Sequence, residues 1–145
     1  MKVTIEEINR DRDEEIIIRC WEANDEILSL VSQLKAKEDC FVGYEGEKIH
    51  RLQSTDIYYF EAVDNKVFIY CAQNVYESRQ KLYELESACK GKGFFRASKS
   101  VVLNLHKIAY VTPYIGGRFE ARLINGENVV VSRQYVPVLK TLLGL

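Results

Sequence analysis

The stretch GFFRASKSVVLN, residues 93–104, joins two aromatic residues to a polar and basic middle and an apolar end. Phe94 and Phe95 predict anchoring in a core, and the run Val101–Leu103 predicts a buried strand. The basic and hydroxyl side chains of residues 96–100 lie between these two anchors. We therefore expect this middle part to project outward as a loop of fixed shape, as a contact loop must.

Outside this stretch, the chain from residue 53 onward is rich in predicted strands. IYYFEA (57–62) and KVFIYC (66–71) flank a turn at residues 63–65, where Asp and Asn favour tight turns. RFEARLI (118–124) and NVVVS (128–132) flank an Asn-Gly hairpin turn. Short connections of this kind, without a βαβ repeat, are typical of antiparallel sheets.

Two short helices are expected in the same part of the chain. Residues 78–93 place Leu82, Leu85 and Cys89 on one helical face and end at a glycine. QYVPVLKTLL, at the C-terminal end, tolerates its proline in a first helical turn.

The first 45 residues predict a small ββα extension. Residues 2–8 and 14–21 have strand-like patterns, and residues 24–38 have apolar side chains at helical spacing behind Asn24, a candidate cap. A hairpin is expected to turn at residues 45–47, and we place the domain boundary there. The prediction is an extension at 1–45, serving dimerisation or regulation, and a main domain at 46–145.

Taken together, the predicted fold class is mainly β (α+β by content), with antiparallel sheets and two or three short helices. No apolar stretch approaches 18 residues, and the N-terminus lacks the apolar core of a signal peptide. We therefore expect a cytoplasmic protein. The cysteines are spread without a CxxC pair, which favours reduced thiols over disulfides or a zinc site: Cys20, Cys40, Cys71 and Cys89.

The net charge of −1 conceals an uneven distribution. Residues 1–80 hold 17 acidic and 10 basic side chains, a net of −7, whereas residues 81–145 hold 4 acidic and 10 basic, a net of +6. A basic half can attract a polyanion even when the total charge cancels. Chance clustering of charges on solvated faces is the alternative.

Catalytic and metal sites have little support. Ser98 or Ser100 could be paired with His106 as in a hydrolase, but no nucleophile motif surrounds either serine. The Gly-Gly pair at 116–117 lacks the flanking pattern of a phosphate-binding loop. We expect no enzyme activity, no metal and no cofactor.

Nucleic-acid binding has positive support from three separated loops or strand ends. DNA recognition needs cations and hydroxyls for phosphates, and side chains that reach base edges. The chain supplies them in residues 60–66, 96–100 and 132–134, and the candidate DNA-binding residues are Asn65, Lys66, Arg96, Ser98, Lys99, Ser100, Arg133 and Gln134. Each one taken alone is better explained as a solvated surface residue, and only a fold that gathers the loops on one face makes them a site.

The segment from about residue 46 to 143 resembles the LytTR family of bacterial DNA-binding domains. The similarity lies in IYYFEAVDNKVFIYC, QKLYELE, GFFRASKSVVLNLHKI and NGENVVVSRQYVPVLKTLL, in the family's order and spacing. The block from Phe94 to Asn104 is close to the family pattern F-x-R-x-H-x-S-x-x-V-N. Ser98 stands where the family often has histidine, so we expect the DNA sequence read by this chain to differ.

The resemblance implies a transcriptional regulator whose loops, and not a recognition helix, enter successive major grooves at promoter repeats. Lys66, Lys99 and the Arg133–Gln134 pair fall at the three contact positions, whereas Arg96 and Ser100 fall at positions of backbone contact or loop support. About 45 residues precede the domain, too few for a receiver, so a stand-alone regulator is expected. The resemblance also implies a small membrane protein that restrains the regulator, and a homodimer on DNA.

Two other functions remain open at this point. The acidic N-terminal part could make the chain a protein-interaction module with no specific DNA target. The serine hydrolase is the third hypothesis.

Overall fold

The computed structural model describes residues 1–35 and 39–145 in full, and residues 36–38 by their backbone alone. The chain divides into two compact units, residues 1–35 and 36–145. No helix in the described part of the chain has the length and apolar character needed to cross a membrane.

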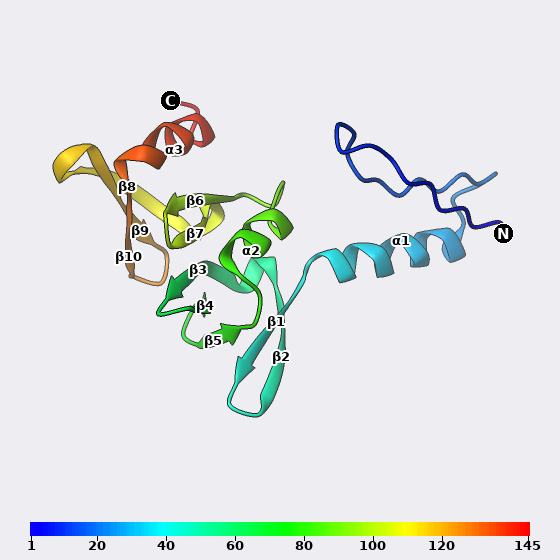
Figure 1. The fold of residues 1–145 in the computed structure, drawn as a ribbon, viewed down its shortest axis with the longest axis horizontal. Helices are drawn as coiled ribbons and strands as arrows, with labels where there is room; N and C mark the ends of the chain where they lie inside the picture. Colours follow the sequence, from blue (N-terminus) through cyan, green and yellow to red (C-terminus); the bar gives the residue numbers. More distant parts are fainter. The chain divides into compact units, whose positions relative to one another are not determined.

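The first unit contains most of helix α1 (Asp25–Glu38), which ends just beyond residue 35 (Figure 1). The predicted cap is confirmed, because the Asn24 side chain accepts a hydrogen bond of 3.0 Å from the backbone N–H of Ile27. The two predicted strands at 2–8 and 14–21 are wrong, since residues 1–24 hold no strand. Their side chains are nearly all exposed, and two short segments without a face to cover are at best marginal as a hairpin.

Within residues 39–145, seven strands form one antiparallel sheet in the order β2-β1-β5-β4-β3-β7-β6. Their bounds are β1 Cys40–Glu45, β2 Lys48–Gln53, β3 Ile57–Val63, β4 Lys66–Cys71, β5 Val75–Ser78, β6 Phe94–Ser98 and β7 Val101–Asn104. Because β1 pairs with β2 and β5, this sheet begins several residues before the expected boundary at 46.

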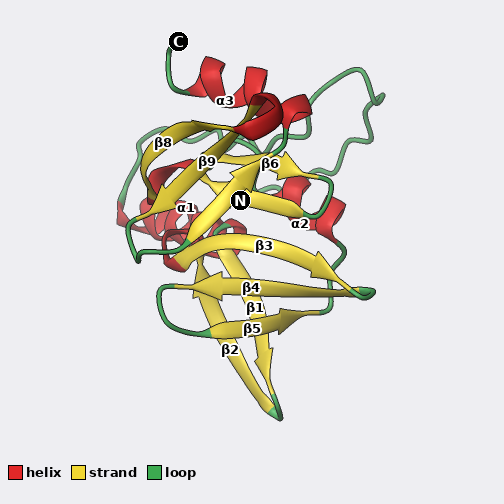
Figure 2. Cartoon of the chain, turned by 90° about the vertical axis from the view of Figure 1, so that its left-hand side faces the viewer, coloured by secondary structure: helices red, strands yellow, loops and turns green.

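A second antiparallel sheet has three strands in the order β10-β9-β8. They are β8 (Ile108–Tyr114), β9 (Arg118–Leu123) and β10 (Asn128–Val131), followed by helix α3 (Val136–Leu142). The predicted class, antiparallel sheets with short helices, is confirmed (Figure 2).

The predicted turns follow from residues that tolerate left-handed backbone. Asp64 and Asn65, with φ of 50° and 64°, form the two-residue loop between β3 and β4. The predicted helix at 78–93 is shorter in the structure, where α2 spans Leu82–Ala88. Ser78 belongs to β5 instead, because it pairs with Val67 of β4 and its side chain is buried there.

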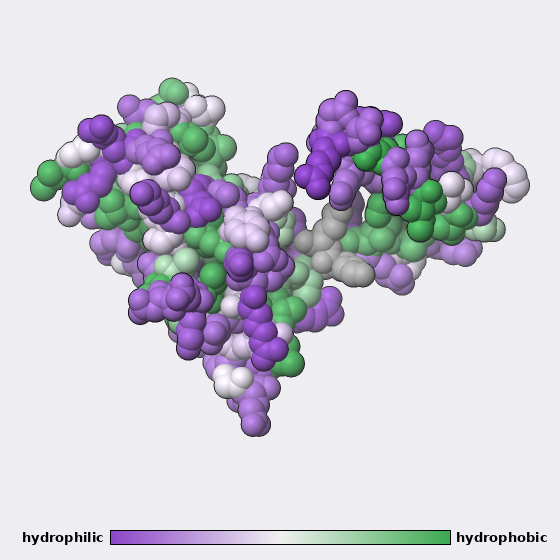
Figure 3. All heavy atoms as spheres, viewed as in Figure 1, coloured by the Kyte–Doolittle hydropathy of each residue, from purple (hydrophilic) through white to green (hydrophobic). Residues whose placement is uncertain are grey.

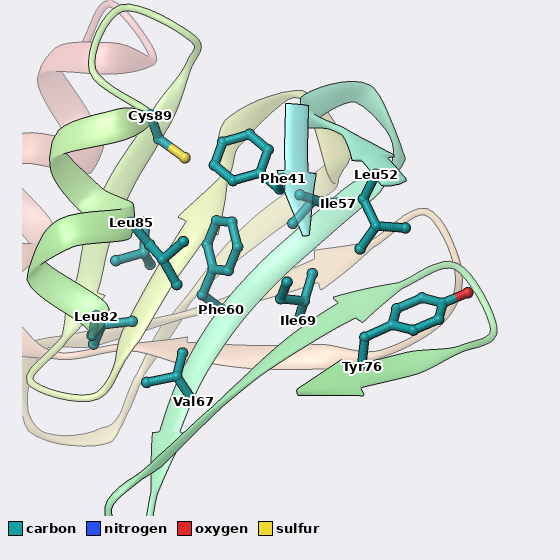
Figure 4. Close-up of a cluster of buried hydrophobic side chains, with 11 residues drawn as sticks. Phe41, Leu52, Ile57, Phe60, Val67, Ile69, Tyr76, Leu82, Leu85 and Cys89 are labelled. Atoms are coloured by element: carbon teal, nitrogen blue, oxygen red, sulfur yellow. The ribbon is translucent and has the colours of Figure 1, made fainter. Parts of the chain in front are cut away.

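The core consists of two clusters of buried side chains, one on each side of β7. Val102 packs in the first cluster, whereas Val101 and Leu103 pack in the second, as alternation along a strand requires. In the first cluster Phe60 lies near Phe41, with ring centroids 5.6 Å apart (Figure 4). Burial on both faces explains why β7 is apolar from Val101 to Leu103 and why it supports the adjacent loop rigidly.

Candidate nucleic-acid interface

The outward loop expected at residues 96–100 is wrong in its length, because residues 96–98 belong to β6 and Ala97 is fully buried there. The turn that remains between β6 and β7 is held by contacts among its own residues. The register of the two strands shifts between Arg96 and Ser98. The Ser98 hydroxyl accepts a hydrogen bond of 3.2 Å from the backbone N–H of Ser100, and the two hydroxyl oxygens lie 3.4 Å apart. Lys99 is exposed at the tip. The turn therefore has a fixed shape that presents one lysine to solvent.

Arg96 is half-buried and engaged within the protein. Its Nε lies 3.2 Å from the carboxylate oxygen Oε2 of Glu86, which belongs to α2. Its Nη1 donates a hydrogen bond of 2.8 Å to the backbone carbonyl of Lys99. Of the two roles expected for Arg96, backbone contact or loop support, these contacts favour support of the loop.

The β3–β4 turn lies beside the β6–β7 turn. β3 pairs with β7, and the backbone N–H of Ala62 donates a hydrogen bond of 2.8 Å to the carbonyl of Ser100. Figure 2 shows both turns at the same end of the large sheet. Asn65 and Lys66 are exposed at this end. The left-handed backbone of Asn65 gives this residue a structural reason to be present, independent of any contact with DNA.

The segment after β10 joins the same region. Both the backbone N–H and the hydroxyl of Ser132 donate to the carbonyl of Ala97, at 2.8 Å and 3.3 Å. Arg133 and Gln134 follow immediately and are exposed. Buried Val136 and Leu139 then fix α3 in the second core cluster. The third loop is thus anchored on the strand that leads into the second.

These contacts place the three predicted loops next to one another. Each presents an exposed cation, Lys66, Lys99 or Arg133. The nearby Glu61 accepts a hydrogen bond of 3.1 Å from the Tyr70 hydroxyl. Burial raises the pKa of Tyr70 above its ordinary value, and the bond to Glu61 raises it further. The arrangement suits a ligand that is polyanionic and wide enough to meet all three loops.

Two neighbours of this region were missed by the sequence analysis. Glu86 holds Arg96 from α2, and no sequence signal indicated that pairing. Gly117 lies against Arg133, since a Cβ added to this glycine would be 2.9 Å from the arginine Cδ. The Gly-Gly pair at 116–117 is the available sequence signal for this contact.

The hydrolase hypothesis is wrong in its geometry. The pairing of Ser98 with Val101 and of Phe94 with Asn104 places the two ends of the β6–β7 hairpin apart. Ser98 and Ser100 lie at the turn, whereas His106 follows Asn104 and donates its backbone N–H to the Asn104 side chain. The serine and histidine side chains are therefore separated by the length of β7.

Comparison with known proteins identifies the main domain. The family model described as "LytTr DNA-binding domain" matches residues 47–144. The sensory transduction protein LytT of Enterococcus faecalis is 30% identical over 99 residues, which cover 68% of this chain and 41% of that protein. The chain thus spans about two fifths of the length of this relative. An uncharacterised HTH-type transcriptional regulator of Staphylococcus aureus is 26% identical over 141 residues, covering 95% of each chain.

A solved structure supports the fold independently. A LytTr DNA-binding domain from Bacillus cereus superposes with a TM-score of 0.70 at 23% identity, covering 74% of this chain and 98% of that domain. The antiparallel architecture, the gathered loops and the family match over residues 47–144 agree. The chain therefore belongs to the LytTR family of DNA-binding domains.

Proposed function

We propose that this protein is a transcriptional regulator that binds duplex DNA in a sequence-specific manner through the three neighbouring loops. The supporting observation is the pair of backbone hydrogen bonds, each 2.8 Å, from Ala62 to Ser100 and from Ser132 to Ala97. They join loops that are about 35 residues apart in sequence into one surface. Family membership supports DNA as the ligand, in keeping with the transcriptional regulator from Staphylococcus aureus that is similar along nearly its whole length.

The proposed roles follow from where each side chain lies. Lys66, Lys99, Arg133 and Gln134 are exposed and can reach base edges in the major groove, where lysine and arginine favour guanine. Ser98 and Ser100 shape the turn that presents Lys99, and Asn65 shapes the β3–β4 turn. Loops on one face can enter successive major grooves only if they cross the DNA backbone between those grooves, so we assign phosphate contacts to the serine hydroxyls and Asn65 as well.

In vitro selection of duplex DNA with the full chain, followed by titration of the selected site at several salt concentrations, tests the proposal. We expect a defined motif and a steep loss of affinity with salt, because several phosphate contacts release counterions. Lys99→Ala should weaken binding to the selected site by about 1–3 kcal/mol, the usual value of a base contact. Lys48→Ala is the matched control, because it removes the same charge at the β1–β2 hairpin tip, away from the loops (Figure 2).

Two results would count against this function. Failure to select any motif would favour the protein-interaction module. Equal losses of affinity in Lys99→Ala and Lys48→Ala would show that Lys99 contributes only its charge and no base contact.

The LytTR family is a DNA-binding class and not an enzyme class. We accordingly infer a regulator without catalytic activity.

We further propose that residues 1–35 mediate dimerisation or bind a regulatory partner. This unit holds nine acidic and five basic side chains. Its large apolar side chains are unusually exposed, including Ile5 at 90% and Trp21 at 107%, and Figure 3 shows hydrophobic side chains on its surface. Exposed apolar surface rimmed by charge is typical of interaction sites. A second copy on DNA and a small membrane protein that restrains the regulator are the two partners implied by the family resemblance.

A further inference from the structure

The turn between β8 and β9 packs against the aliphatic part of Arg133. This turn comprises Ile115–Gly117, with Tyr114 before it and Arg118 after it. A Cβ added to Gly117 would lie 2.9 Å from Cδ and 3.1 Å from Cγ of Arg133. Real Cβ atoms essentially never come so close to another heavy atom as the first of these distances. The absence of a side chain at 117 therefore leaves the space in which the arginine stem lies.

A glycine at this turn could be required by the left-handed backbone or by the contact with Arg133, and Gly116 distinguishes the two reasons. Gly116 and Gly117 have almost the same left-handed backbone, with φ of 78° and 75°, so a side chain strains the backbone at either position. A Cβ on Gly116, however, would meet only Nε of Arg118, at an ordinary 3.8 Å. Only Gly117 combines the backbone requirement with contact to Arg133.

The turn is itself held in place by Arg118. Its Nε donates a hydrogen bond of 2.8 Å to the carbonyl of Ile115, closing the turn. Its guanidinium carbon lies 4.9 Å from the centroid of the Tyr114 ring, within the range of a cation–π contact. Arg133 therefore lies on a surface that is fixed before any ligand arrives.

We propose that Gly117 is a positioning residue for DNA recognition, which acts by giving the stem of Arg133 a fixed path along the β8–β9 turn. An exposed arginine loses considerable rotamer entropy when it makes a directed contact. Confining its Cγ and Cδ in advance lowers that cost and narrows the directions that its guanidinium can take. The inference rests on the proposed function, in which Arg133 contacts a base edge.

Four variants of the full chain test this inference: Gly117→Ala, Gly116→Ala, Arg133→Ala and the double variant Gly117→Ala with Arg133→Ala. For each, the ratio of Kd for a scrambled duplex to Kd for the selected duplex is measured. Gly117→Ala should lower this ratio on the order of tenfold, comparable with losing one good base contact. Gly116→Ala should lower it much less. In the Arg133→Ala background, Gly117→Ala should cause no further loss.

Thermal unfolding of the same variants provides a second readout. Gly117→Ala should lower Tm more than Gly116→Ala, because both strain the backbone but only the first displaces Arg133. This additional loss of Tm should disappear in the Arg133→Ala background, where Cγ and Cδ are absent. This comparison holds even if Gly117→Ala alone is largely unfolded, since the double variant then regains stability.

The outcomes separate the inference from the function on which it rests. Equal effects of the two glycine substitutions, or an excess that persists without Arg133, would overturn the positioning role alone. If Arg133→Ala keeps the full preference for the selected duplex, both the assignment of Arg133 to the DNA interface and the role of Gly117 fail.

Discussion

At the scale of single residues, Arg96 shows how a basic side chain in a DNA-binding motif can serve the fold. One nitrogen meets the Glu86 carboxylate and another meets the carbonyl of Lys99, so the side chain ties α2 to the β6–β7 turn. A phosphate contact and a support role predict different results for the same substitution. The first changes the number of counterions released, whereas the second changes the stability and shape of the loop.

We predict that Arg96→Ala lowers the free energy of unfolding by about 1–2 kcal/mol, because it removes two hydrogen bonds that involve a charged group at a partly exposed site. DNA affinity should fall as well, while the slope of log K against log salt stays unchanged. Denaturant unfolding and salt titration measure the two quantities. Glu86→Gln, which keeps the side-chain size, should cause a smaller loss of stability. Unchanged stability with a slope reduced by about one would instead make Arg96 a phosphate contact.

At the scale of elements, the end of β7 is joined to β3 by a buried amide. Asn104 is only 2% exposed, and its Nδ2 donates a hydrogen bond of 2.8 Å to the carbonyl of Ile57. Its Oδ1 accepts from the backbone N–H of His106 at 3.0 Å, which caps the short helical turn at 105–107. One side chain thus fixes the chain path where the large sheet ends and the approach to β8 begins.

We predict that Asn104→Ala lowers the free energy of unfolding by about 1–3 kcal/mol, since it leaves a buried carbonyl and a backbone N–H without their partner. Denaturant unfolding of the full chain measures the loss. Asn128→Ala is a suitable control, because Asn128 is also on a strand but is exposed. Its side chain accepts one hydrogen bond, of 3.3 Å, from Arg122. A loss no larger than that of the control would show that water replaces the buried bonds of Asn104.

At the scale of the whole molecule, the two units differ in how far their apolar side chains are buried. The unit at 36–145 has two buried clusters, whereas Ile27 is the one buried apolar side chain in residues 1–35. The second unit contains the complete pairing of both sheets and the three loops. It should therefore fold and hold its DNA face without residues 1–35.

If residues 1–35 mediate dimerisation, as proposed, a chain starting at residue 36 should remain folded and bind a single selected half-site with unchanged affinity, but should not self-associate. Light scattering and titration against single and repeated sites measure the two properties. The affinity for the repeated site should fall, because linked binding of two copies is lost. If the shortened chain matches the full chain in oligomeric state and in affinity for the repeated site, residues 1–35 have no role in dimerisation.

The sequence alone determined the elements with strong local signals. Alternation and β-branched runs located β3, β4, β7, β9 and β10, and the Asp-Asn and Asn-Gly pairs located two of the turns, because these signals are encoded within a few neighbouring residues. They did not locate β5, or the part of β6 at residues 96–98, which was expected to be a loop. The same reasoning failed at residues 2–8 and 14–21, where a strand-like pattern has no sheet to join. It also extended α2 into β5, since Ser78 is a strand residue only through its pairing with β4.

The tertiary structure alone decided that the candidate residues form one surface and which of them are engaged internally. Residue type and spacing predicted Lys66, Lys99 and Arg133 as DNA-binding residues. Their proximity, however, depends on hydrogen bonds between segments that are far apart in sequence. The pairing of Arg96 with Glu86 and the close approach of Gly117 to the Arg133 side chain also depend on contacts between distant segments. Local patterns record what each segment can do, whereas long-range contacts arise only when packing of the two cores brings those segments together.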